Sequence, residues 1–144
     1  MPYTDTKNLL RECDAGTKTA INSIQQVLPH TTDSKLKEVL QCAEQRHADL
    51  GKRAHKMLDA LNAPEKDPSP MTRTMTQVTT AIKLTADSSN QEIAAVMYDG
   101  CRMGIKSLSR YLNQYSAATP ESRDLAGDLI ASEEELTHAL LGYL

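Results

Sequence analysis

The stretch Glu44-Gln45-Arg46-His47 lies in the middle of a long amphipathic segment, residues 34–61. His47 falls on the centre line of the apolar face of that segment, and Glu44 lies at its edge. A Glu and a His three residues apart project from one side of a helix, so together they can bind a metal ion inside a helix bundle. The apolar face that predicts the helix consists of Leu36, Val39, Leu40, Ala43, Leu50, Ala54, Met57, Leu58 and Leu61.

The last segment of the chain repeats this motif as Glu135-Leu136-Thr137-His138. Its apolar residues centre on a face that contains Glu133, whereas Glu135 and His138 are rotated away from that face. Glu133 is therefore an alternative inward-facing acid. The predicted metal ligands are Glu44, His47, Glu135 and His138, with Glu133 as the alternative to Glu135. Each pair can also be read as an ordinary surface or internally satisfied helix pair.

Helical spacing of apolar residues also predicts helices over residues 6–28 and 91–117, and a last helix from about residue 119 to the C-terminus. Asp33 or Ser34 is expected to cap the helix of residues 34–61. Thr119 is expected to cap the last helix, with Pro120 at its first position. Short connections between long amphipathic helices imply two antiparallel hairpins.

The segment between the two hairpins is expected to cross the length of the bundle. Residues 62–70 contain three prolines and predict a loop, and a weaker helical pattern follows over residues 71–86. We interpret residues 64–90 as a crossover that contains one short helix, because a second hairpin that starts at the far end of a bundle requires a long connection.

The composition narrows the classes of protein. A length of 144 residues predicts one domain, and five Tyr with no Trp or Phe favour a helical core of aliphatic residues. The net charge of -3 disfavours nucleic-acid binding. We expect neither a membrane span nor a secretion signal, because no long apolar run is present. Three widely spaced Cys favour reduced thiols and a cytoplasmic location.

Two short segments centred on glycine also repeat. Asp14-Ala15-Gly16 matches Asp99-Gly100, as Glu44-x-x-His47-Ala48 matches Glu135-x-x-His138-Ala139. On these motifs and the connection lengths, the chain resembles the ferritin-like superfamily from about Leu9 to Leu144, and most closely its small bacterial members of unknown function. The resemblance implies an all-α, antiparallel four-helix bundle of two hairpins joined by a long crossover with a short extra helix.

In metal-binding members of that superfamily, the first and third bundle helices each supply one carboxylate, and the other two each supply Glu-x-x-His. The resemblance thus implies iron or manganese as the cofactor. The positions that correspond to the missing carboxylates are approximately Thr17 and Cys101, and neither is an acid. Asp14 and Asp99 lie nearby but fall off the apolar faces. An incomplete di-metal site follows, and it disfavours strong catalysis.

Two functional hypotheses result. The first is a ferritin-like protein of unassigned biochemical role, with a metal bound between the helix of residues 34–61 and the last helix. The alternative is a non-enzymatic helical interaction or dimerisation module that has lost the metal site, with a homodimer as one form. A weaker third hypothesis is a small-ligand pocket at the bundle centre, where Thr17 and Cys101 would leave space.

Overall fold

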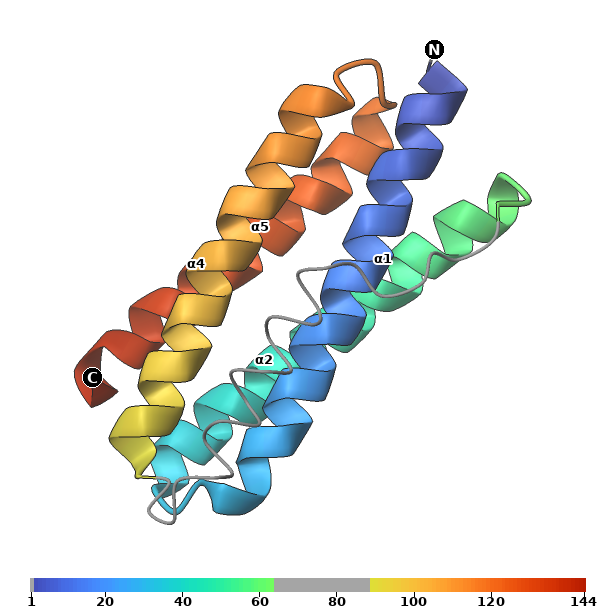
Figure 1. Ribbon diagram of the computed structural model, residues 1–144. Helices are drawn as coiled ribbons and strands as arrows, with labels where there is room; N and C mark the ends of the chain where they lie inside the picture. Colours follow the sequence, from blue (N-terminus) through green and yellow to red (C-terminus); the bar gives the residue numbers. More distant parts are fainter. Residues whose placement is uncertain (1, 64–88) are drawn as a thin grey trace.

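The computed structural model describes residues 2–63 and 89–144, which form four long helices (Figure 1). No strand occurs in these two ranges. The all-α four-helix bundle expected from the sequence is therefore confirmed. The predicted helix of residues 71–86 and most of the predicted crossover lie outside the described residues. The helices are α1 (Pro2–Val27), α2 (Ser34–Ala60), α4 (Asn90–Gln114) and α5 (Pro120–Leu140), with short 3-10 turns at Leu28–His30 and Leu141–Tyr143.

Side-chain caps begin three of the helices. Asp33 Oδ1 accepts a hydrogen bond from the Leu36 N–H at 2.9 Å, which starts α2 and decides between the two predicted caps. Ser89 caps α4 in the same way. Thr119 caps α5 with Pro120 at the first helical position, as predicted.

Polar side chains form hydrogen bonds to the connections between helices at both ends of the bundle. Asn90 Oδ1, at the start of α4, accepts hydrogen bonds from the N–H groups of Thr32 and Asp33 at 3.0 and 3.2 Å. At the opposite end, Asp5 Oδ2 accepts from the Ala117 N–H at 2.9 Å. This bond holds residues 115–118 in a turn against α1, so α4 ends at Gln114 and not at the predicted residue 117.

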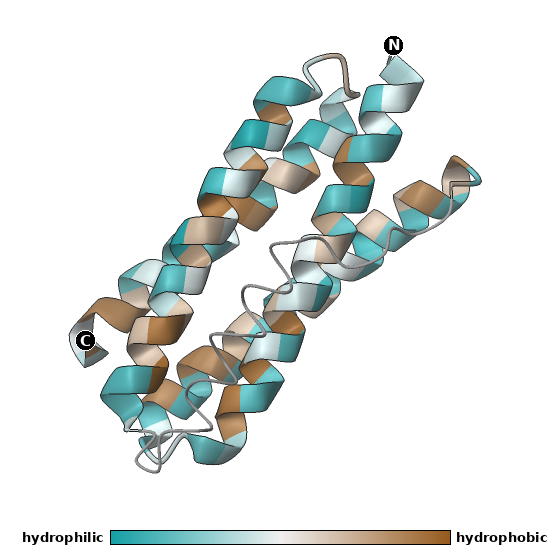
Figure 2. Cartoon of the chain, in the orientation of Figure 1, coloured by the Kyte–Doolittle hydropathy of each residue, from teal (hydrophilic) through white to brown (hydrophobic). Residues whose placement is uncertain are grey.

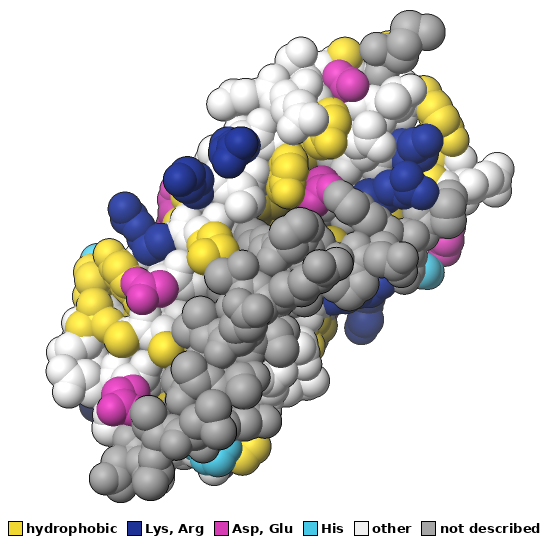
Figure 3. Space-filling model, in the orientation of Figure 1, with side chains coloured by type: hydrophobic (Ala, Val, Ile, Leu, Met, Phe, Trp, Pro, Cys, Tyr) yellow, Lys and Arg dark blue, Asp and Glu magenta, His cyan; other side chains and the backbone are white. Residues whose placement is uncertain are grey.

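The four helices pack as two hairpins, α1 with α2 and α4 with α5. The hairpins meet chiefly where α2 packs on α5, and α1 contacts both α4 and α5 to a smaller extent (Figure 1). Acidic and basic side chains are interspersed on the face shown in Figure 3. No helix in the described ranges is long and apolar enough to cross a membrane.

Two apolar clusters, one toward each end, form the core, and each helix contributes to both. Hydrophobic residues recur along all four helices, interrupted by hydrophilic ones (Figure 2). Between the clusters, the buried positions of each helix carry small or polar residues. On α2, for example, Ala43 belongs to one cluster and Leu50 to the other, and His47 lies between them. Thr17 on α1 and Glu133 on α5 are buried polar residues that also lie between the clusters along their helices. A buried polar layer thus crosses the middle of the bundle.

Candidate functional site

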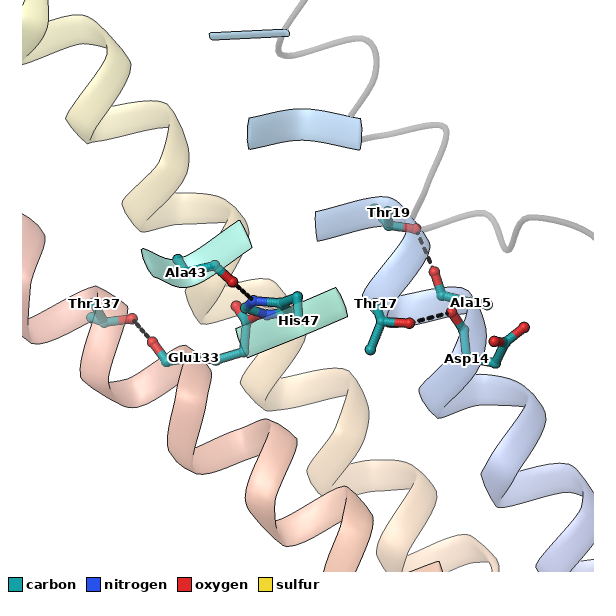
Figure 4. Close-up of polar contacts among 8 residues, drawn as sticks. All are labelled: Asp14, Ala15, Thr17, Thr19, Ala43, His47, Glu133 and Thr137. Atoms are coloured by element: carbon teal, nitrogen blue, oxygen red, sulfur yellow. Dashed lines mark hydrogen bonds and ion pairs between the residues drawn. The ribbon is translucent and has the colours of Figure 1, made fainter. Parts of the chain in front are cut away.

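His47 is the centre of the polar layer, and its side chain is fully buried. Its Nδ1 lies 2.7 Å from the carbonyl oxygen of Ala43, one turn earlier on α2 (Figure 4). Because a carbonyl can only accept, Nδ1 carries a proton and donates it. The other ring nitrogen, Nε2, pairs with the carboxylate of Glu133 on α5. Glu133 is itself only 7% exposed, so this contact joins two helices inside the core.

The Glu133 carboxylate determines the charge of His47. Burial is the largest influence and favours the neutral ring, but the hydrogen bond and charge of Glu133, with the Ala43 carbonyl, outweigh it. The pKa of His47 is therefore raised above its ordinary value. An imidazolium paired with a carboxylate results, and a substitution that left either charge buried without its partner would cost about 3–5 kcal/mol.

Cys101 and Gly104 on α4 enclose the other side of Glu133. The Cys101 thiol interacts with the carboxylate, and burial together with the Glu133 charge raises the pKa of that thiol. Cys101 thus stays protonated and is a poor metal ligand. A Cβ atom on Gly104 would lie 3.4 Å from Glu133 Oε2, so the absence of a side chain there lets the acid approach α4.

The four predicted ligands do not meet at one point. Glu135 is exposed and forms an ion pair with Arg46, and His138 is exposed in the last turn of α5. Glu44 is half-buried on α2. The structure therefore brings His47 together with Glu133, the alternative acid. Within residues 2–63 and 89–144, no group of three or more His, Cys, Asp or Glu side chains is placed to hold a metal ion.

The rotation of α5 explains this arrangement. Leu129, Leu136 and Leu140 are buried at spacings of seven and four residues, and Glu133 lies on the same side of the helix as these three. Glu135 and His138 follow at positions that turn to solvent. The second Glu-x-x-His match is therefore a surface feature of α5, next to a run of three acids.

Of the positions predicted in place of the family's other carboxylates, Thr17 lies in this layer, and Cys101 belongs to the adjoining apolar cluster and contacts Glu133. Thr17 and Cys101 are 1% and 2% exposed, and Thr17 Oγ1 donates to the Asp14 carbonyl at 2.8 Å. Asp14 was expected off the apolar face but is buried, with Oδ2 at 3.0 Å from Lys18 Nζ. The donor set of the layer, with a threonine and a neutral thiol at these positions, does not fit a di-iron or di-manganese centre.

A small cavity adjoins Glu133 on the side of α1 and α4. Its volume is about 30 Å³, which is room for one water molecule and far below the size of a ligand pocket. The small-ligand hypothesis therefore gains no support from this cavity. Its lining residues are Gly16, Thr19, Ala20, Gly100, Gly104, Leu108, Leu129 and Glu133.

The sequence interpretation missed a groove on the outside of the bundle, between α2 and α5. Its volume is about 500 Å³. Ser132 lines it and is 3% exposed, and among the described residues its Oγ has no hydrogen-bond partner. The sequence did contain a signal for this groove. Two small residues, Cys42 and Ala43, are adjacent on α2, and two more, Ser132 and Ala139, lie seven residues apart on α5. The other lining residues are Lys35, Glu38, Val39, Arg46, Glu135, Leu136 and Tyr143.

Fold and site together define an all-α four-helix bundle with a charged pair across the middle of its core. The chain is similar to the crystal structure of a DUF305 fragment from Deinococcus radiodurans, with a TM-score of 0.78 and 12% identity. The match covers 96% of this chain and 93% of that one, and at this identity it establishes the fold alone. No protein-family model and no curated protein sequence matches the chain, so the ferritin-like resemblance is supported only as an all-helical bundle.

Proposed function

We propose that this chain is a non-enzymatic helical module that binds a protein partner on the face formed by α2 and α5. The groove of about 500 Å³ carries this proposal. Its floor includes Leu136 and Ala43, each 5% exposed, and charged side chains stand along its rim. An apolar floor with a polar rim is the usual anatomy of a surface that receives an amphipathic helix.

The buried pair supports the proposal by fixing the two walls of the groove. His47 belongs to α2 and Glu133 to α5, so their contact sets how these helices lie against each other. Both groups of the pair are satisfied within the chain: one ring nitrogen by Ala43 and the other by the acid. In this proposal the polar layer therefore fixes the packing of α2 against α5, and the outer surface of these helices binds the partner.

A pair of matched substitutions on α5 tests the proposed binding face. Ala139 is exposed in the groove, whereas Ala131 is exposed on the same helix and does not line it. Ala139→Arg should reduce the recovery of the bound partner, measured by quantitative mass spectrometry after affinity purification, by about tenfold (~1.4 kcal/mol). Ala131→Arg should recover the partner as the wild type does. Equal recovery with both variants would show that the groove is not the binding face.

A single metal ion held by His47 and Glu133 is the second candidate. A metal-binding His commonly donates its other ring N–H to a backbone carbonyl, as His47 does to Ala43. Elemental analysis after titration with iron or manganese should then find about one ion per chain in the wild type and none in His47→Ala. His138→Ala, which changes an exposed His, is the control. Equal metal content in the wild type and His47→Ala would exclude this candidate.

A further inference from the structure

Five exposed residues form a row along the outer surface of α2: Lys35, Glu38, Cys42, Arg46 and Asp49. Successive members are separated by three, four, four and three residues, so the spacing is the same in both directions from Cys42. At 100° per residue, all five lie within about 40° of the direction of Cys42. They therefore share one narrow stripe, and the first four of them form one wall of the groove.

When the stripe is followed in the opposite direction, an acidic residue stands at each place where a basic one stood, and the reverse. From the N-terminal end the stripe is basic, acidic, thiol, basic, acidic. Two such stripes that meet antiparallel at Cys42 place Lys35 opposite Asp49 of the second copy, and Glu38 opposite Arg46 of the second copy. The two-fold axis repeats both contacts, which gives four attractive pairs and no repulsive pair along the stripe. A parallel arrangement in the same register would bring like charges together.

We infer that the partner of the α2 face is a second copy of this chain, docked antiparallel along the stripe with Cys42 at the two-fold axis. This inference rests on the proposed function, since it names the partner that the module binds. The side chains at the crossing are small, Cys42 and Ala43, and helices with small residues at their contact approach to about 8 Å. The second copy would also cover Val39 and Ala139 in the adjoining groove.

Contacts within the chain are compatible with this arrangement. Arg46 pairs with Glu135, which holds its guanidinium on the outer surface beside the stripe. Asp49 Oδ1 accepts from Gln45 Nε2 at 3.0 Å and keeps its other oxygen for a second donor. Rim charges of this kind mainly fix register and specificity, and the covered apolar surface supplies affinity.

Charge exchange between Lys35 and Asp49 tests the antiparallel register. Each of Lys35→Glu and Asp49→Lys creates two repulsive pairs in the dimer and should raise its dissociation constant, measured by analytical ultracentrifugation, about tenfold or more. The double variant restores both pairs and should restore the dimer. Within one chain the two positions are 14 residues, or about 21 Å, apart, so they cannot compensate each other there. Lys37→Glu, an exposed change of the same charge off the stripe, should have no effect.

Cys42 gives an independent measurement of the crossing point. Of the three thiols, Cys42 is exposed, and Cys13 and Cys101 are buried. Diamide accepts one electron and one proton from each of two thiols, so it should join two copies by a Cys42–Cys42 bond. The linked species should be absent in Cys42→Ser, slow to form in Lys35→Glu, and recovered in Lys35→Glu/Asp49→Lys.

The results separate this inference from the proposed function. A wild-type protein that sediments as a monomer up to about millimolar concentration, or a dimer that is unchanged by both charge reversals, would overturn the inference. If Ala139→Arg still reduces the binding of a different protein, the proposed function stands and only the identity of the partner is wrong. If a dimer forms and responds to the charge exchange, both are supported.

Discussion

Replacement of Glu133 by Gln should reverse the way in which stability depends on pH. In the wild type the acid holds the His47 ring as an imidazolium, and it raises the pKa of His47 above 6.5. Gln is nearly the same size but carries no charge, so burial and the Arg46 charge, which lower the pKa of the ring, are then opposed only by the Ala43 carbonyl and outweigh it. The ring becomes neutral, and Nδ1 continues to donate to the Ala43 carbonyl.

Starting from pH 6.5, the wild type loses stability as the pH rises, whereas the Glu133→Gln protein loses stability as the pH falls. The wild-type pair contributes fully below pH 6.5, and its contribution is lost as the pH rises through the higher folded-state pKa. The Glu133→Gln protein is fully stable above pH 6.5 and loses stability as the pH falls, because its unfolded chain binds the proton first. Each slope reaches at most about 1.4 kcal/mol per pH unit. The stability difference between the proteins should therefore shrink as the pH rises from 5.5 to 8.

Urea unfolding at several pH values measures this difference directly. At pH 7 the variant should be less stable by about 1.5–3 kcal/mol, the usual range for a lost hydrogen bond to a charged group. Glu134→Gln is the matched control, since Glu134 is exposed on the same turn. A penalty for Glu133→Gln that is the same at every pH would refute the assignment of a charged His47.

Three further predictions concern packing, thiols and the connection between hairpins. Gly51→Ala should lower the free energy of unfolding, measured in urea, by about 1–3 kcal/mol, because the new Cβ would lie 3.0 Å from Thr17 Oγ1. The double variant Gly51→Ala/Thr17→Ala should recover part of that loss. Native protein should react with one equivalent of a thiol reagent at pH 8, at Cys42, and denatured protein with three, because burial protects the others and raises their pKa. Asn90→Ala should cost about 1–2 kcal/mol in the free energy of unfolding, since it removes three hydrogen bonds to the turn before α2; an equal melting temperature would contradict this.

Most of the fold could be predicted from the sequence, because helices with one apolar face and clear caps are local features. The bounds of α2 differ from the prediction by one residue, and the caps at Asp33 and Thr119 are those expected from the sequence. His47 was also predicted to lie on the buried face, since apolar neighbours on both sides fix its direction. These features depend on a few neighbouring residues in the chain.

The site was harder to predict because it depends on how two distant helices are rotated. The Glu-x-x-His motif of α5 pointed to Glu135, while the apolar face pointed to Glu133, which is the acid that contacts His47. Where a short motif and the hydrophobic face disagree, burial of several leucines outweighs the preference of one polar residue. The groove required knowledge that α2 and α5 are neighbours, which the hairpin pattern alone does not give.

The inner and outer contacts between α2 and α5 should differ greatly in strength. Arg46 and His47 are adjacent on α2, and they pair with Glu135 and Glu133, two residues apart on α5. The outer pair has side chains 50% and 65% exposed, so water and salt screen it, and such pairs contribute about 0–1 kcal/mol. Glu135→Gln should therefore change the unfolding free energy by less than about 1 kcal/mol, with a smaller effect at high salt. If Glu135→Gln cost as much as Glu133→Gln, the register of these two helices would be set at the surface and not by the buried pair.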